Sequence, residues 1–151
     1  MLEKELTLMK LSPEYIVGLV DGEGSFTVYI KDANNIISRE RRVRVEPKFY
    51  IKLVEKDKAV LYTLQQFFGC GSVYFQKDHR LNHQDCYRYE VYRRDDLEKI
   101  IIPFFREHKL KFYSKQEDFK LFCEIMGMIK KGIHLNNKGL KKMFLIKQKM
   151  H

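Results

Sequence analysis

The sequence contains no tryptophan, three prolines and three cysteines among its 151 residues. The cysteines, Cys70, Cys86 and Cys123, are odd in number, scattered and never spaced as a CxxC pair. This spacing excludes a disulfide framework and a cysteine zinc site, so we expect small buried thiols. The chain also lacks any apolar run near the roughly 18–20 residues that cross a bilayer, and its start, MLEKELTLMK, is unlike a signal peptide. We therefore expect an intracellular protein with no membrane partner.

Negative charge is also scarce, because 20 acidic residues stand against 29 lysines and arginines. The net charge of +9 favours a polyanionic partner, either nucleic acid or an anionic membrane surface. On charge alone, a basic protein without such a partner remains an alternative. With 44% hydrophobic residues the chain can form one domain, 1–151, with its own core. Within it we expect an N-terminal extension over 1–11 and a basic C-terminal helix over 134–151.

Apolar residues recur at helical and strand spacings along the chain. Ser12 and Pro13 open a helix that continues to Gly22, because serine is a good cap and proline suits the first helical position. Strands are expected over 25–31, 43–53, 72–76 and 86–94. Further helices are expected over 57–69, from Asp95 or Asp96 to Pro103, over 114–132 and over 136–150. This order predicts an α+β fold, with helices on one face of an antiparallel sheet.

Two prolines and one capping pattern predict local features of these elements. Pro47 is expected to mark a bulge or a sheet edge, because proline cannot donate to a central ladder. Pro103 is expected to stop or kink its helix. Ser114 and Glu117 have the spacing of a capping box, which would open the helix that ends near Gly132.

The polar faces of the predicted strands are rich in basic, aromatic and amide side chains. Such groups on one broad surface can contact phosphates and read base edges in a DNA groove, although an ordinary solvated face is the alternative. Glu90 would balance a neighbouring arginine or accept from a cytosine amine. The candidate DNA-binding residues are Ser25, Thr27, Tyr29, Lys31, Arg42, Arg44, Lys48, Tyr50, Lys52, Ser72, Tyr74, Gln76, Arg88, Glu90 and Tyr92.

The segment VDGEGSF places two acids, Asp21 and Glu23, where the first helix should end. A carboxylate at the negative end of a helix dipole costs about 0.3–1 kcal/mol. Gly18 and Gly22 are four residues apart, so they share a helix face without side chains, although each glycine costs about 1 kcal/mol relative to alanine. This face predicts a tight contact with another helix. The alternative is that Gly22 simply ends its own helix.

The stretch YIVGLVDGEGSF resembles the LAGLIDADG motif of homing endonucleases, and Ile16 to Gly24 match its nine positions. The later stretches FYIKLVEKDKAVLYTLQQFFGCGSVYF and YRYEVYRRDDLEKIIIPFF, and the helical region from Ser114, are also similar to the family, so the resemblance covers roughly residues 12–150. It implies an αββαββα fold with a saddle-shaped sheet and C-terminal helices. Val17 replaces a small motif residue, and Glu23 stands where aspartate is often seen.

The resemblance also implies a function. It predicts a site-specific DNA endonuclease that makes a metal-dependent double-strand break across the minor groove of a long pseudo-palindromic target, leaving 3′ overhangs. Family relatives also include RNA-binding intron maturases and DNA-binding proteins that do not cleave, which remain alternatives. Because the chain carries one copy of the motif, it would act as a homodimer on double-stranded DNA. The dimer interface would involve Tyr15, Gly18, Leu19, Asp21 and Gly22.

The family chemistry assigns roles to individual residues. Glu23, at the eighth motif position, would hold Mg²⁺ against the scissile phosphates, with Mn²⁺ or non-productive Ca²⁺ as other occupants. Asp21 is interpreted as a helix-end group rather than a metal ligand. Lys115, then Lys111, would stabilise charge or orient water, although phosphate contacts are equally compatible with each lysine. Glu55 is a weaker candidate for positioning solvent.

Overall fold

The computed structural model describes residues 9–30, 44–77, 79–81 and 83–151. Its elements are α2 (Pro13–Glu23), β1 (Gly24–Ile30), β2 (Val45–Val54), α3 (Lys58–Phe68), β3 (Ser72–Gln76), β4 (Cys86–Val91), α4 (Arg94–Asp96), α5 (Ile102–Glu107), α6 (Tyr113–Lys130) and α7 (Asn137–Gln148). The predicted order of helices and strands is therefore confirmed. The predicted Lys31 and Arg42 lie outside the described residues. No described helix is both long and apolar enough to span a bilayer.

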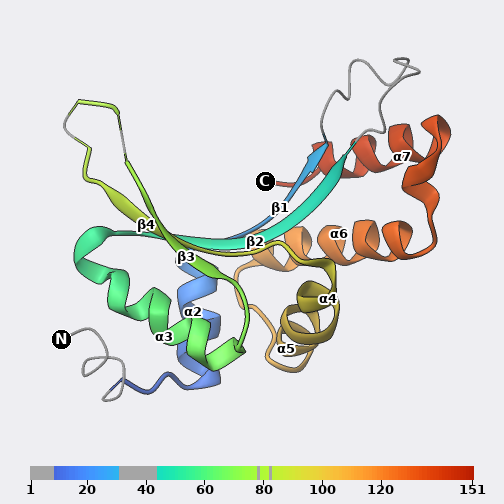
Figure 1. The fold of residues 1–151 in the computed structure, drawn as a ribbon. Helices are drawn as coiled ribbons and strands as arrows, with labels where there is room; N and C mark the ends of the chain where they lie inside the picture. The colour runs from blue at the N-terminus through green and yellow to red at the C-terminus, as the bar shows by residue number, and fades with distance from the viewer. Residues whose placement is uncertain (1–8, 31–43, 78, 82) are drawn as a thin grey trace.

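The strands form one antiparallel sheet in the order β1-β2-β4-β3. Figure 1 shows this sheet curving upward at both ends, with α2 to α6 on its convex side and α7 stacked on α6 beside the ends of β1 and β2. The predicted α+β fold with helices on one sheet face is thus confirmed. None of the helices that the structure describes covers the concave face (Figure 1).

The core forms between the convex face of the sheet and the helices. Phe26, on β1, lies at its centre, because its ring centroid is 5.1–5.5 Å from those of Phe49, Phe105, Phe119 and Phe122. Strand alternation sends these apolar side chains inward and leaves the intervening polar side chains on the opposite face. The same alternation that builds the core therefore also builds the concave surface.

Helix ends follow local chemistry where the cap is a neighbour in sequence. Ser12 caps α2, and its hydroxyl accepts from the Tyr15 N–H at 3.1 Å. Gly69 ends α3 with a φ of 68°, a left-handed conformation that glycine adopts without strain. Pro47 pairs with Val28 in an unbroken β1–β2 register, and β4 pairing begins only at Phe49. The edge prediction for Pro47 is therefore confirmed and the bulge prediction is wrong.

Several predicted boundaries differ from the structure. β4 ends at Val91 rather than residue 94, because Arg94 already begins α4 and its guanidinium donates to the Val45 carbonyl at 3.2 Å. Pro103 does not stop its helix, because α5 continues through it to Glu107, directly after a π-helical turn at Leu97–Ile101. The alternative, that Pro103 kinks the helix, stays a prediction. Wider π-helical spacing is a recognised way for a helix to accommodate an irregularity.

The predicted capping box at Ser114 and Glu117 is wrong. α6 begins one residue earlier, at Tyr113, and its N-cap residue Phe112 makes no side-chain cap. The carboxylate that serves this end of the helix comes instead from Asp21 on α2. A distant acid thus replaces the local cap that the sequence pattern indicated.

The cysteines are free and only partly buried, rather than fully buried as expected. Burial raises the pKa of the Cys70 and Cys123 thiols, which keeps both protonated near neutral pH. These thiols therefore behave as small packing groups.

Candidate active site and nucleic-acid interface

Glu23 is the last residue of α2, and β1 begins at the next residue without a linker. A Cβ on Gly24 would lie 2.7 Å from Val20 Cγ1 and 2.9 Å from Val20 Cα, so this helix-to-strand junction requires glycine. Glu23 is exposed, and its side chain has no hydrogen-bond or ion-pair partner in the part of the chain that the structure describes. Its carboxylate is therefore available to an external cation.

Asp21, the other acid of the motif, is only 4% exposed and points into its own chain. Its carboxylate accepts from the Lys111 N–H at 3.0 and 3.1 Å and from the Phe112 N–H at 3.1 Å. These groups lead into α6, whose N-terminal end carries the positive pole of the helix dipole. The acid is unfavourable at the end of α2 but favourable at the start of α6. This geometry agrees with the helix-end interpretation and gives Asp21 an intrachain role.

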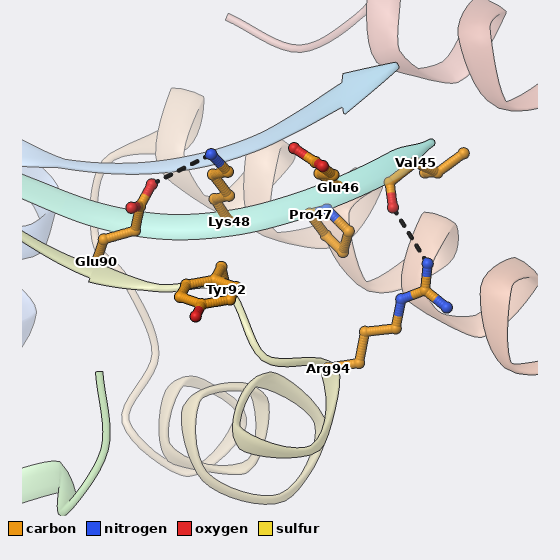
Figure 2. Close-up of a pocket in the computed structure, with 7 residues that line it drawn as sticks. All are labelled: Val45, Glu46, Pro47, Lys48, Glu90, Tyr92 and Arg94. Atoms are coloured by element: carbon orange, nitrogen blue, oxygen red, sulfur yellow. Dashed lines mark hydrogen bonds and ion pairs between the residues drawn. The ribbon is translucent and has the colours of Figure 1, made fainter. Parts of the chain in front are cut away.

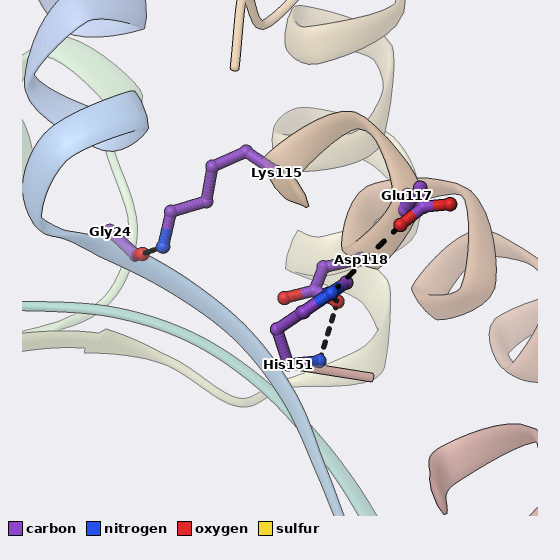
Figure 3. Close-up of polar contacts among 5 residues, drawn as sticks. All are labelled: Gly24, Lys115, Glu117, Asp118 and His151. Atoms are coloured by element: carbon purple, nitrogen blue, oxygen red, sulfur yellow. Dashed lines mark hydrogen bonds and ion pairs between the residues drawn. The ribbon is translucent and has the colours of Figure 1, made fainter. Parts of the chain in front are cut away.

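The two candidate lysines are placed differently. Lys115, on the first turn of α6, extends to the α2–β1 junction, where its ammonium donates to the Gly24 carbonyl (Figure 3). Lys111 contributes its backbone N–H to Asp21, and the residue is exposed. The structure therefore places the Lys115 ammonium at Gly24, the residue that follows Glu23.

Glu55 lies farther from this junction. It follows the last residue of β2 and is exposed, and its N–H donates to the Asp85 carbonyl at 3.1 Å. Ile51 is the β2 partner of Gly24, so Glu55 is four residues beyond the junction, roughly 13 Å along an extended chain. Its predicted part in positioning solvent stays a prediction.

The exposed face of α2 lacks side chains at two of its positions, Gly18 and Gly22. Tyr15 is 51% exposed, Gly18 and Gly22 are exposed, and Leu19 is half-buried. A Cβ added at Gly18 or Gly22 would meet nothing within 4 Å. No contact within the described chain therefore explains these glycines, although each costs about 1 kcal/mol of helix propensity relative to alanine. A helix packed closely against this face would explain both.

The strand register places the candidate DNA-binding residues that lie within the four strands on the concave face. One row across the sheet is Ser25, Tyr50, Glu90 and Ser72. The next row toward the α2–β1 junction is Lys52, Arg88 and Tyr74, and Thr27 pairs with Lys48. Arg44 and Tyr92 lie just outside β2 and β4, and both are exposed. The result is one continuous surface of basic, aromatic and hydroxyl groups.

Glu90 joins the side chains at the centre of this surface. Its carboxylate, which is nearly buried, lies 3.1 Å from Arg88 Nη2 and 3.5 Å from Lys48 Nζ, and it accepts from the Tyr74 hydroxyl at 3.2 Å. The Arg88 guanidinium also stacks 3.6 Å from the centre of the Tyr50 ring. Partial burial raises the pKa of Tyr74; Arg88 opposes this shift and Glu90 adds to it. Glu90 therefore orders its neighbours, as the predicted balance with an arginine requires.

A pocket of about 360 Å³ opens beyond the end of β4, beside the unpaired edge of β2 (Figure 2). Its lining combines both charges with an aromatic ring and consists of Val45, Glu46, Pro47, Lys48, Glu90, Tyr92 and Arg94. Arg94 was not among the predicted site residues, although in the predicted strand it continues the alternation of Arg88, Glu90 and Tyr92. The pocket extends the polar concave surface beyond the ladder.

The contact between α7 and the sheet was also missed. Lys147 Nζ lies 5.8 Å from the centre of the Tyr29 ring on β1. The basic composition of residues 134–151 signalled a charged helix, but only packing on α6 brings it beside β1. The concave surface therefore has an additional lysine at its rim.

The described residues contain no cluster of three or more His, Cys, Asp or Glu side chains able to hold a metal ion. This result is compatible with Mg²⁺, which retains waters and commonly uses only one or two protein carboxylates together with substrate phosphates. Glu23 supplies one exposed carboxylate of the required type. A second carboxylate and the phosphates would have to come from outside this chain.

A sequence profile described as LAGLIDADG endonuclease matches residues 16–126. Probable intron-encoded endonuclease 3 of Neurospora crassa is 33% identical over 144 residues, covering 95% of this chain and 25% of that protein. The homing endonuclease I-TnaI superposes with a TM-score of 0.79 at 39% identity, covering 95% of this chain and 90% of I-TnaI. I-GzeII, in complex with its DNA target, gives a TM-score of 0.79 at 31% identity, covering 95% and 45% of the two chains. The chain spans about a quarter of the length of its Neurospora relatives.

Proposed function

Because the chain belongs to the LAGLIDADG endonuclease family, we propose that two copies of it form a site-specific DNA endonuclease that cuts both strands of a long pseudo-palindromic duplex and leaves 3′ overhangs. The observation that carries this proposal is the exposed Glu23 carboxylate at the foot of a glycine-faced helix. The last two turns of α2 therefore provide a carboxylate that can bind a cation, on Glu23, and a surface that can contact a partner helix, at Gly18 and Gly22.

The pairing of two copies follows from the need to cut two strands. Each chain supplies one Glu23, and a two-fold axis along the paired α2 helices would bring the second Glu23 alongside the first. The bare surfaces at Gly18 and Gly22 support this contact. Further support comes from the length of I-GzeII. This chain covers 45% of it, so two copies of the chain would together match most of its length. A symmetric pair would present two concave sheets to the two halves of the target.

The divalent cation is proposed to be Mg²⁺, held by Glu23 from both copies together with phosphate oxygens of DNA. LAGLIDADG endonucleases generally use divalent metals, and exposed carboxylates suit this hard cation. When bound, the cation supplies Lewis-acid stabilisation of the charge that develops on the phosphate. Two unpaired Glu23 carboxylates would otherwise repel each other across the interface.

The chain's own groups would divide the remaining tasks. The concave surface binds the DNA groove and backbone, which fixes the phosphates over the α2–β1 junction. Lys115, held at the Gly24 carbonyl, keeps a positive charge beside Glu23 and stabilises developing negative charge. Glu90 holds Arg88, Lys48 and Tyr74 in position for base contacts.

Cation removal tests the proposed activity. The substrate is a duplex made by rejoining the DNA on both sides of the gene's insertion point. We expect both strands to be cut in Mg²⁺, no cleavage after chelation with EDTA, and retained binding without cleavage in Ca²⁺. Gel electrophoresis measures cleavage, and a duplex with both half-sites scrambled is the control. Binding in every cation without any cleavage would instead support the non-cleaving alternative.

Substitution of Glu90 tests the ordering of the concave surface. Glu90→Gln removes the charge that holds Arg88 and Lys48 but keeps the shape of the side chain. We expect discrimination against a mismatched base pair near these residues to fall roughly 5- to 50-fold, since a good bidentate contact contributes about 1–3 kcal/mol. Competition binding in Ca²⁺ with single-base variants of the target measures this effect. Unchanged discrimination at every position would show that Glu90 does not order the reading face.

A further inference from the structure

Asp21 connects the end of α2 to the start of α6, the helix that carries Lys115. We propose that Asp21 is a positioning residue: its buried carboxylate fixes the start of α6 so that the Lys115 ammonium is held beside Glu23. This inference rests on the proposed function, because it assigns Asp21 a part in the same cleavage reaction. It differs from a metal-ligand role, since the three hydrogen bonds that the carboxylate accepts from the described chain all come from backbone N–H groups.

The first step of the argument is that α6 has no cap of its own. Its N-cap residue Phe112 makes no side-chain cap, and its carbonyl accepts from the Gln116 N–H at 2.9 Å in the first turn. The Asp21 carboxylate instead binds the N–H groups of Phe112 and the preceding Lys111. The carboxylate thereby sets where the helix begins relative to α2.

The second step is the short distance along the chain from this anchor to the lysine. Lys115 is three residues after Phe112, which is less than one helical turn. Its ammonium reaches back to the Gly24 carbonyl, three residues after Asp21 and next to Glu23 (Figure 3). Asp21 and Lys115 therefore connect the same two elements at the same end. Weakening the hydrogen bonds of Asp21 to the start of α6 should therefore displace the Lys115 ammonium from the Gly24 carbonyl.

A double-mutant cycle separates positioning from a general structural role. Asp21→Asn keeps one acceptor oxygen but loses the charge and one carboxylate oxygen. We expect it to lower the single-turnover cleavage rate in Mg²⁺ roughly 10- to 100-fold, which is the scale of a small misplacement of a reacting group. In a Lys115→Ala background, the same change should lower the cleavage rate by less than a further threefold. Because this background is slow, its cleavage is measured over long incubations with enzyme in excess. Equal losses in both backgrounds would overturn the proposal.

Two further readouts do not depend on activity. Hydrogen exchange of the Lys111 and Phe112 amides should accelerate at least 10-fold in Asp21→Asn, and DNA affinity in Ca²⁺ should change by less than threefold. Unchanged exchange at both amides would overturn the proposal. Asp118→Asn is the matched control, because Asp118 is a buried acid of α6 that instead binds the His151 N–H at 2.8 Å (Figure 3). This control should leave the cleavage rate and both amides unchanged.

The failure of this inference can be distinguished from failure of the proposed function. If the wild type cuts its target and Glu23→Gln does not, the endonuclease stands, and additive effects of Asp21 and Lys115 reject only the positioning role. If the wild type does not cut under any cation, the proposed function fails and the positioning role in cleavage fails with it.

Discussion

Replacing Glu23 with glutamine is expected to abolish DNA cleavage while DNA binding persists. Glutamine keeps the size of the side chain but removes the charge that would hold Mg²⁺ at the α2–β1 junction. Metal stabilisation of a phosphoryl transition state contributes several kcal/mol, so the cleavage rate should fall roughly 1,000-fold or more. Binding should stay intact or improve slightly, because the variant brings less negative charge near the DNA phosphates.

Single-turnover cleavage in Mg²⁺ and equilibrium binding in Ca²⁺ measure the two effects separately. Glu14→Gln is the matched control, since Glu14 is an exposed glutamate at the opposite end of the same helix. It should leave the cleavage rate within about twofold of wild type and cost at most a few tenths of a kcal/mol in helix stability. Cleavage by Glu23→Gln at the wild-type rate would reject Glu23 as the metal ligand.

Replacing Gly18 with leucine is expected to convert the proposed dimer into monomers without unfolding the chain. A side chain at this position meets nothing within 4 Å in its own chain, and leucine improves helix propensity by roughly 0.8–1 kcal/mol over glycine. In a paired helix, however, the same side chain would occupy the space through which the partner backbone approaches. Cleavage of both strands should be lost, because each monomer carries a single Glu23.

Size-exclusion chromatography with light scattering measures the mass of each variant, and thermal unfolding reports its stability. Gly127→Leu is the matched control, because Gly127 is also an exposed helical glycine with nothing within 4 Å, but it lies on α6. We expect this control to remain dimeric and active. A Gly18→Leu protein with the mass of the wild-type dimer would place the interface elsewhere. A wild type that is monomeric with and without DNA would reject the proposed dimer.

The elements of this fold follow from local patterns in the sequence. Alternation in β1 and β2 defines two faces, so the inward position of Phe26 and the outward positions of Ser25 and Thr27 could be predicted before any tertiary contact was known. Ser12 and Gly69 also act on backbone groups only a few residues away. Such interactions are encoded within one or two turns, which is why their prediction succeeded.

Boundaries that depend on distant contacts were predicted less well. The start of α6 depends on Asp21, which is 90 residues away from Lys111 in sequence. The end of β4 depends on Arg94, whose guanidinium reaches the Val45 carbonyl at the start of β2. A local capping pattern at Ser114 could not compete with a buried carboxylate supplied by another helix.

By itself, the sequence determined the order of helices and strands, the basic concave face and the acid–glycine motif, because periodicity and backbone preference operate over neighbouring residues. Only the tertiary structure decided that the two acids of the motif have opposite environments. Folding turns Asp21 inward to the backbone of α6 and leaves Glu23 exposed at the start of the sheet. The physical reason is the helical repeat: residues two positions apart differ by about 200° around the axis, so packing one side of α2 buries one acid and exposes the other.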